Sequence, residues 1–75
     1  MLHTSTAARA LGLTDREYET LEHIDAGRTP AEAARAMGIS LTTVRGYVAA
    51  LHRKLNAGHT AALLRRAREA GLLGE

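Results

Sequence analysis

Basic and hydroxyl side chains gather between residues 40 and 54, in the segment SLTTVRGYVAALHRK. They belong to Ser40, Thr42, Thr43, Arg45, Arg53 and Lys54. Guanidinium, ammonium and hydroxyl groups bind the phosphate oxygens of nucleic acids, and an arginine can also donate two hydrogen bonds to one guanine. The chemistry that this set of side chains offers is therefore binding to duplex DNA.

Two helices joined by a glycine turn are needed to position these side chains. The first begins at a capping box formed by Thr29 and Glu32 and ends at Gly38. The second begins at a Ser40 cap and covers residues 41–55. Its buried face is predicted from apolar residues spaced by four, three and four positions, which are Val44, Val48, Leu51 and Leu55. This is the layout of a helix-turn-helix, whose second helix enters the DNA major groove.

Further helices are predicted on both sides of this pair. One begins at Thr14, which forms a second capping box with Glu17, and ends at Gly27. Another runs from about Thr60 to Gly71. The predicted fold class is therefore all-α, with four helices.

Residues 1–12 are predicted to form a short N-terminal arm, in which Thr4 or Ser5 caps an Ala-rich turn. The remaining residues, 13–75, form the helix-turn-helix domain. Seventy-five residues suffice for one small domain, and the absence of cysteine excludes disulfides and thiolate metal sites.

The charges of the chain are unevenly distributed. Four basic residues and six acids give residues 1–40 a net charge of −2, whereas six basic residues and two acids give residues 41–75 a net charge of +4. Such a basic half fits a polyanionic partner, although a solvated charged surface has the same pattern. No apolar run approaches the roughly 18 residues of a membrane span, and no signal-peptide pattern is present, so we expect a cytoplasmic protein.

With the helices placed, the chain resembles the LuxR/GerE-type DNA-binding domain, the C-terminal effector of quorum-sensing and response regulators. The matching residues are Leu13-Thr14, Arg16-Glu17, Glu19, Leu21, Ile24, Gly27, Thr29, Glu32, Ala34, Gly38-Ile39-Ser40, Thr43-Val44-Arg45, Lys54-Leu55 and Gly71-Leu72-Leu73. Their spacing holds over residues 13–73, about four-fifths of the chain. The resemblance implies a four-helix domain, a transcriptional regulator in which helices two and three bind DNA and helix four forms the dimer contact.

The chain departs from the family pattern within the second helix of the pair. The family usually has histidine where Tyr47 stands, and Gly46 and Ala49 occupy positions whose side chains often face bases. Gly46 costs about 1 kcal/mol relative to alanine inside a helix, which indicates either close approach of another backbone or drift of the sequence. Direct readout would then rest on Arg45 and Thr42, so the chain reads DNA by sequence or by shape.

The predicted DNA-binding residues are Ser40, Thr42, Thr43, Arg45, Gly46, Tyr47, Ala49, Arg53 and Lys54. We expect Arg45 to contact a base, with a phosphate or a surface position as its alternatives, and Arg53 and Lys54 to contact phosphates. Tyr47 either places its hydroxyl on a phosphate or packs against the first helix. From the resemblance, the predicted dimer contacts are Leu63, Leu64, Ala67 and Leu72. The expected partners are thus double-stranded DNA and a second copy.

Neither an enzyme nor a cofactor or metal site is predicted. No two of the four histidines are placed three or four residues apart on one helix, and no nucleophile has an evident base. A different class of function stays open, namely a protein-interaction module that binds a full-length regulator or RNA polymerase without reading DNA. Three residues keep that alternative open, namely Gly46, Ala49 and Thr60. Of these, Thr60 stands where the family usually has arginine.

Family members usually carry a receiver or ligand-binding domain ahead of this module, and only twelve residues precede it here. A stand-alone, nucleoid-associated regulator is therefore expected, with a fragment of a longer regulator as the alternative.

Overall fold

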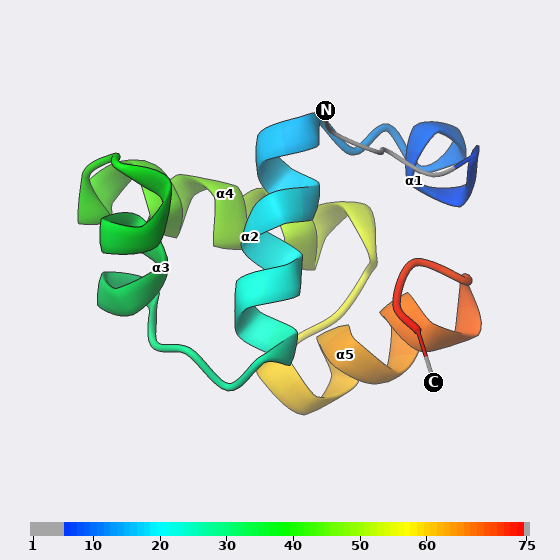
Figure 1. The fold of residues 1–75 in the computed structure, drawn as a ribbon. Coiled ribbons are helices and arrows are strands. Elements are labelled where there is room, and N and C mark those ends of the chain that lie inside the picture. Colours follow the sequence, from blue (N-terminus) through cyan, green and yellow to red (C-terminus); the bar gives the residue numbers. More distant parts are fainter. Residues whose placement is uncertain (1–5, 75) are drawn as a thin grey trace.

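Five α-helices form the fold of the computed structural model, which describes residues 6–74 (Figure 1). They are α1 (Thr6–Ala10), α2 (Asp15–Asp25), α3 (Pro30–Met37), α4 (Leu41–Lys54) and α5 (Thr60–Glu69). No strand occurs between residues 6 and 74, so the predicted all-α class is confirmed. The four predicted helices are α2 to α5, and α1 lies within the predicted arm. In Figure 1, α2 crosses α4, with α3 beside one half of α4 and α5 below its other end.

Two reciprocal capping boxes set the beginnings of α2 and α3. The Thr14 hydroxyl accepts the backbone N–H of Glu17 at 3.1 Å, and the Glu17 carboxylate accepts the N–H of Thr14 at 2.9 Å. Thr29 and Glu32 repeat the arrangement at 3.1 and 2.8 Å. Each box satisfies two of the N–H groups that a helix start leaves without partners, so both predicted boundaries are confirmed.

The turn between α3 and α4 depends on a glycine. Gly38 has a φ of +69°, in the left-handed region, and its N–H bonds back to the carbonyls of Ala34 and Arg35. A side chain at this position would be strained, which is why the sequence places glycine there. The turn lets α4 start at the Ser40 cap only two residues after α3 is closed.

A histidine caps α5, which the sequence pattern did not predict. The imidazole Nδ1 of His59 accepts the backbone N–H of Ala62 at 3.2 Å. Since a ring nitrogen that accepts a hydrogen bond carries no proton, this bond defines the tautomer of His59. The predicted start of the helix near Thr60 is nevertheless confirmed.

Helix α4 is the central element because it contributes to two hydrophobic clusters. One cluster joins α1, α2, α4 and α5 and consists of Ala8, Leu13, Leu21, Leu51, Leu55, Leu63, Ala67 and Leu72. The other joins α3 to α4 through Ala33, Ala34 and Val44, with Ile39 and Val48 packed against it. The predicted inward stripe of α4 is therefore confirmed, with Val48 only partly buried.

The two ends of the described chain pack onto the same core. Ala8 of α1 is fully buried, and Leu72, beyond the end of α5, is 2% exposed. The Tyr18 hydroxyl donates to the Leu72 carbonyl oxygen at 2.9 Å, which fastens the segment after α5 to α2. The predicted caps at Thr4 and Ser5 lie outside the described residues.

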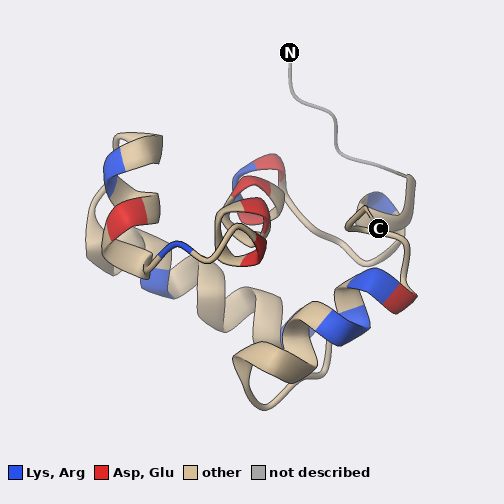
Figure 2. Ribbon diagram, turned by 60° about the horizontal axis from the view of Figure 1, so that its bottom comes forward, with Lys and Arg blue, Asp and Glu red and all other residues tan. Residues whose placement is uncertain are grey.

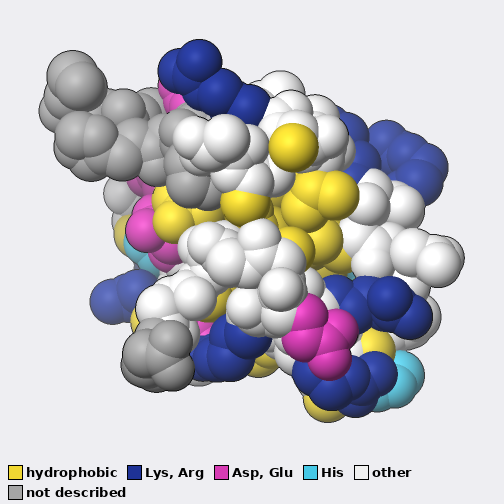
Figure 3. Space-filling view, turned by 90° about the vertical axis from the view of Figure 1, so that its right-hand side faces the viewer, with side chains coloured by type: hydrophobic (Ala, Val, Ile, Leu, Met, Phe, Trp, Pro, Cys, Tyr) yellow, Lys and Arg dark blue, Asp and Glu magenta, His cyan; other side chains and the backbone are white. Residues whose placement is uncertain are grey.

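Hydrophobic side chains reach the surface on the face formed by α1 and α5, between basic and acidic ones (Figure 3). A groove of about 400 Å³ lies there, lined by Leu11, Lys54, Leu55, Asn56, Arg66, Glu69 and Ala70. Among the helices of residues 6–74, none combines the length and the apolar character that crossing a membrane requires.

Candidate nucleic-acid interface

The start of α4 is held by two hydroxyl groups. The Ser40 Oγ accepts the backbone N–H of Thr43 at 3.0 Å and lies 2.8 Å from the Thr43 hydroxyl. This confirms Ser40 as the cap of α4. Both side chains are exposed, as is Thr42 between them. The first turn of α4 therefore presents hydroxyl groups and a helix N-terminus to a partner, the combination that binds phosphate.

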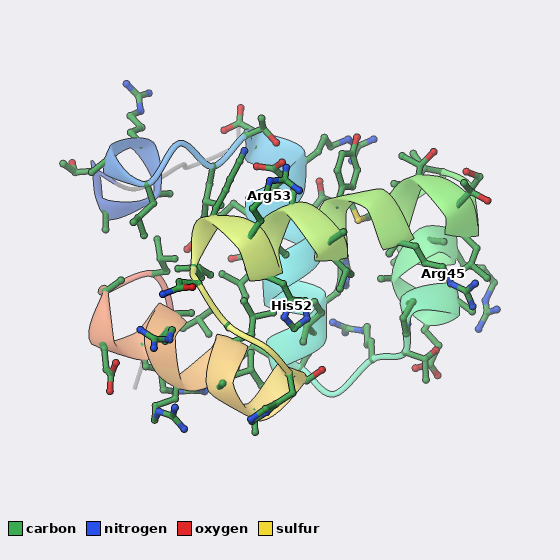
Figure 4. All side chains as sticks on the ribbon, turned by 180° about the vertical axis from the view of Figure 1, so that it is seen from behind. Arg45, His52 and Arg53 are labelled. Carbon is green, nitrogen blue, oxygen red and sulfur yellow. The ribbon has the colours of Figure 1, made fainter. Side chains whose placement is uncertain are left out.

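One side of α4 is left uncovered by the rest of the chain, and we term it the outer face of α4. Its exposed residues are Leu41, Thr42, Thr43, Arg45, Gly46, Ala49 and Arg53. Figure 4 shows α4 nearest the viewer, with Arg45 toward its N-terminal end beside α3 and Arg53 toward its C-terminal end. Six of the nine predicted DNA-binding residues thus lie on this face, together with Leu41, which was not predicted.

The charges of Arg45 and Arg53 have no partner within residues 6–74. Two other arginines do form ion pairs, since Arg16 binds Glu19 at 2.8 Å and Arg68 binds Asp25 at 2.6 Å. Both guanidinium groups of the outer face can therefore donate all their hydrogen bonds to an external acceptor.

Lys54 is engaged within the chain itself. Its amine donates to the Gly12 carbonyl oxygen and to the Glu17 carboxylate, both at 2.7 Å, and so joins the end of α4 to the start of α2. Its side chain is 26% exposed. The structure thus gives Lys54 a role in packing α4 against α2, and its predicted phosphate contact stays a prediction.

The environment of Glu17 reflects this ion pair. Burial of the carboxylate raises its pKa, but the hydrogen bond from Lys54, the bonds from Thr14 and the Lys54 charge together outweigh burial, so the pKa of Glu17 lies below its usual value. The carboxylate is therefore ionised at neutral pH and holds Lys54 in place.

The remaining predicted residues of α4 differ in exposure. Gly46 and Ala49 are exposed, whereas Tyr47 is half-buried. A Cβ atom at Gly46 would meet nothing within 4 Å, so no other backbone segment among residues 6–74 explains the glycine. Either drift or the approach of a partner accounts for it.

Three of the four predicted dimer contacts lie inside the core. Leu63 and Ala67 are fully buried and Leu72 is 2% exposed, so their side chains have no surface to offer a second copy. Leu64 alone is half-buried. An apolar helix face has the same sequence pattern whether it packs in its own core or against a second chain. The sequence therefore could not distinguish core residues of α5 from dimer contacts.

Leu41 did not enter the predicted site, although it directly follows the Ser40 cap and stands four positions before Arg45 on the same side of the helix. It is 36% exposed. The position of Leu41 could have placed it in the predicted site, because the first turn of a recognition helix is the part that contacts bases. Leucine as a residue type gives no such indication.

Acidic residues lie mainly on α2 and not on α4. Figure 2 shows most of them along the ribbon of α2, whose sequence DREYETLEHID contains five acids. The sequence of α4, LTTVRGYVAALHRK, contains none. The outer face of α4 therefore presents positive charge without a competing carboxylate on its own helix, as binding to a polyanion requires.

Comparison with known proteins agrees with this geometry. Residues 11–67 match the GerE family, described as bacterial regulatory proteins of the luxR family. No curated protein matches the chain.

Two solved structures of VqmA are similar to the chain. One is VqmA bound to DPO, with 41% identity and a TM-score of 0.76 over 81% of this chain and 30% of that one. The other is the Vibrio cholerae VqmA dimer in the absence of target DNA, described among LuxR-type receptors, with 42% identity and a TM-score of 0.79 over 87% and 30% of the two chains. The chain thus spans about 30% of the length of these proteins. Together with the arrangement of α3 and α4, these matches show that the chain belongs to the luxR family of bacterial regulatory proteins and carries its DNA-binding helix-turn-helix domain.

Proposed function

We propose that the chain binds double-stranded DNA through the outer face of α4, placed in the major groove, and thereby regulates transcription. The observation that carries this proposal is the pair of unpartnered guanidinium groups, Arg45 and Arg53, on a face without acids. The likeness to VqmA, whose target is DNA, supports it.

The residues of the outer face have different roles in this proposal. Arg45 lies in the N-terminal half of α4, where the residues of a recognition helix contact base edges, so it donates to a base, and guanine is its preferred partner. Arg53 lies two turns later and binds a phosphate. The hydroxyls of Ser40 and Thr43, at the helix start, bind a second phosphate.

Removal of Arg45 tests the base contact. We expect Arg45→Ala to weaken binding to the preferred site by about 1–3 kcal/mol and to relax discrimination at one base pair. The measurement is fluorescence anisotropy with a random duplex pool and then with the enriched site, at several salt concentrations.

Arg9→Ala is the matched control, because Arg9 is an exposed arginine of α1 without a partner in the described part of the chain. If the two variants lose the same affinity, the effect is one of net charge and Arg45 reads no base. If the parent protein binds no duplex even at low salt, the protein-interaction alternative replaces the DNA proposal.

A second copy of the chain completes the proposed complex, with α5 as the contact. Leu64 is the half-buried apolar residue of α5, and Ala61, Arg65 and Arg68 are exposed near it. The VqmA structure described as a dimer supports the assembly of two copies. Sedimentation velocity with and without duplex tests it, and a monomer in both conditions would refute it.

A further inference from the structure

Leu41 is the large hydrophobic residue that stands exposed among residues 6–74, at 36%. A single exposed leucine is ordinary on a protein surface, so its position decides what it means. Leu41 is the first residue of α4, and it stands four positions before Arg45. Residues at that spacing are neighbours on one side of a helix, so Leu41 adjoins the residue proposed to read a base.

The residues around Leu41 and Arg45 offer methyl groups as well as hydroxyl groups. Ala49 is exposed one turn after Arg45, and the exposed Thr42 carries a methyl group beside its hydroxyl. Gly46 adds no side chain. Arg45 is thus a long polar side chain among small ones, and the exposed side chain of Leu41 is the larger apolar group beside it.

Aliphatic groups in the major groove distinguish the bases by what those bases expose. Thymine presents a C5 methyl group there beside its O4 acceptor, whereas guanine, adenine and cytosine carry hydrogen-bonding atoms but no methyl group. A leucine pressed against those polar atoms removes their water without replacing the hydrogen bond, and this costs affinity. The same leucine against a thymine methyl buries apolar surface on both sides.

From this juxtaposition we propose that Leu41 determines specificity by selecting a thymine next to the base that Arg45 reads. The inference rests on the proposed function, since it requires α4 to lie in the major groove. It adds that the preferred DNA site contains a thymine recognised through its methyl group.

Replacement of thymine by deoxyuridine tests the proposal, because uracil keeps the pairing and the hydrogen-bonding atoms of thymine and lacks only the methyl group. A site enriched from a random duplex pool is synthesised with each thymine replaced singly by deoxyuridine. We expect one replacement in each half-site to weaken binding about fourfold, the effect of one buried methyl group, and the other replacements to have little effect.

Two variants connect that methyl effect to Leu41. Leu41→Ala should bind the thymine and uracil duplexes equally, whereas Leu41→Met, which keeps an apolar side chain of similar size, should keep the difference. Both substitutions fall on an exposed position of the first helical turn, so the fold should persist, and circular dichroism verifies it.

The outcomes separate the inference from the proposed function. Absence of salt-dependent binding to any duplex overturns the proposed function, and the inference with it. Binding without an enriched thymine, without a uracil effect, or with the same uracil effect in Leu41→Ala overturns the inference alone.

Discussion

A basic side chain of α4 can bind a partner only where no acid of the chain already holds its charge. Arg45 and Arg53 meet this condition within residues 6–74, whereas Lys54 binds Glu17 at 2.7 Å. Three residues with the same sign of charge therefore divide into two that face outward and one that holds α4 against α2.

We expect loss of Arg53 to reduce the salt dependence of DNA binding. Loss of Lys54 should instead act first on the free energy of unfolding and lower it.

Gly46 gives a prediction about the free chain. Gly46→Ala should raise the free energy of unfolding by about 0.5–1 kcal/mol, because alanine loses less backbone entropy in a helix and its Cβ meets no neighbour within 4 Å. Urea unfolding of the parent and the variant measures this difference.

The direction of the change in the free energy of unfolding shows whether the fold requires glycine at position 46. A gain in stability means that the fold does not need Gly46, and leaves the approach of a partner or drift as its reason. A loss of stability would contradict the structure around residue 46, since it would require a contact that the open space excludes.

At the scale of elements, the position of α4 depends on its connection to α2. Leu21 and Leu51 are fully buried in the same cluster, and Lys54 reaches both the Gly12 carbonyl and the Glu17 carboxylate from the end of α4. A charged group at the edge of the core thus fixes the end of the helix whose outer face is proposed to contact DNA.

Substitution of Glu17 tests this connection. Glu17→Gln keeps an oxygen that can accept the Thr14 N–H but removes the charge that holds Lys54, so the free energy of unfolding should fall by about 1–3 kcal/mol at pH 7. Because folding lowers the pKa of Glu17, its contribution is fully present above the pKa of an unfolded glutamate and is lost as the pH falls from there through the lower pKa of the folded protein. Urea unfolding at pH 7 and pH 3 should therefore show a smaller loss on acidification in the variant than in the parent.

Glu32→Gln is the matched control for that experiment. Glu32 occupies the same position in the second capping box, where the hydrogen bond from the Thr29 backbone lowers its pKa, but it is exposed and no lysine binds it. Its substitution should change stability at pH 7 little. Equal losses in the two variants would show that the capping box, and not the Lys54 ion pair, carries the effect.

The caps and the buried stripe of α4 were predictable because they depend on residues close in sequence. Thr14 and Glu17, like Thr29 and Glu32, are three positions apart, so their hydrogen bonds follow from local helix geometry. The His59 cap is local too, but histidine is not among the usual capping residues, and the pattern therefore missed it.

The residues that the sequence assigned less well are those whose partners lie far along the chain. Lys54 and Glu17 are 37 positions apart, and a lysine at a helix end fits a phosphate as well as a carboxylate. Leu63, Ala67 and Leu72 form an apolar set that suits a core or an interface, and only packing on α1, α2 and α4 shows which one it is.

At the scale of the molecule, charge is separated between two helices. Helix α2 contains five acids and α4 contains none (Figure 2). This separation leaves α4 with basic residues and no acids, which favours association of α4 with a polyanion and should make that association sensitive to salt. The net charge of +2 understates this effect, because it averages over both sides.

The most direct test of the account is to map the amide chemical shifts of the protein as duplex DNA is added at low salt. If the outer face of α4 enters the major groove, the largest changes fall on residues 40–53, while the exposed residues of α2 change little. Changes confined to α5, with its exposed Arg65 and Arg66, and an unchanged α4 would contradict the account, because DNA would then bind by charge alone on a different face.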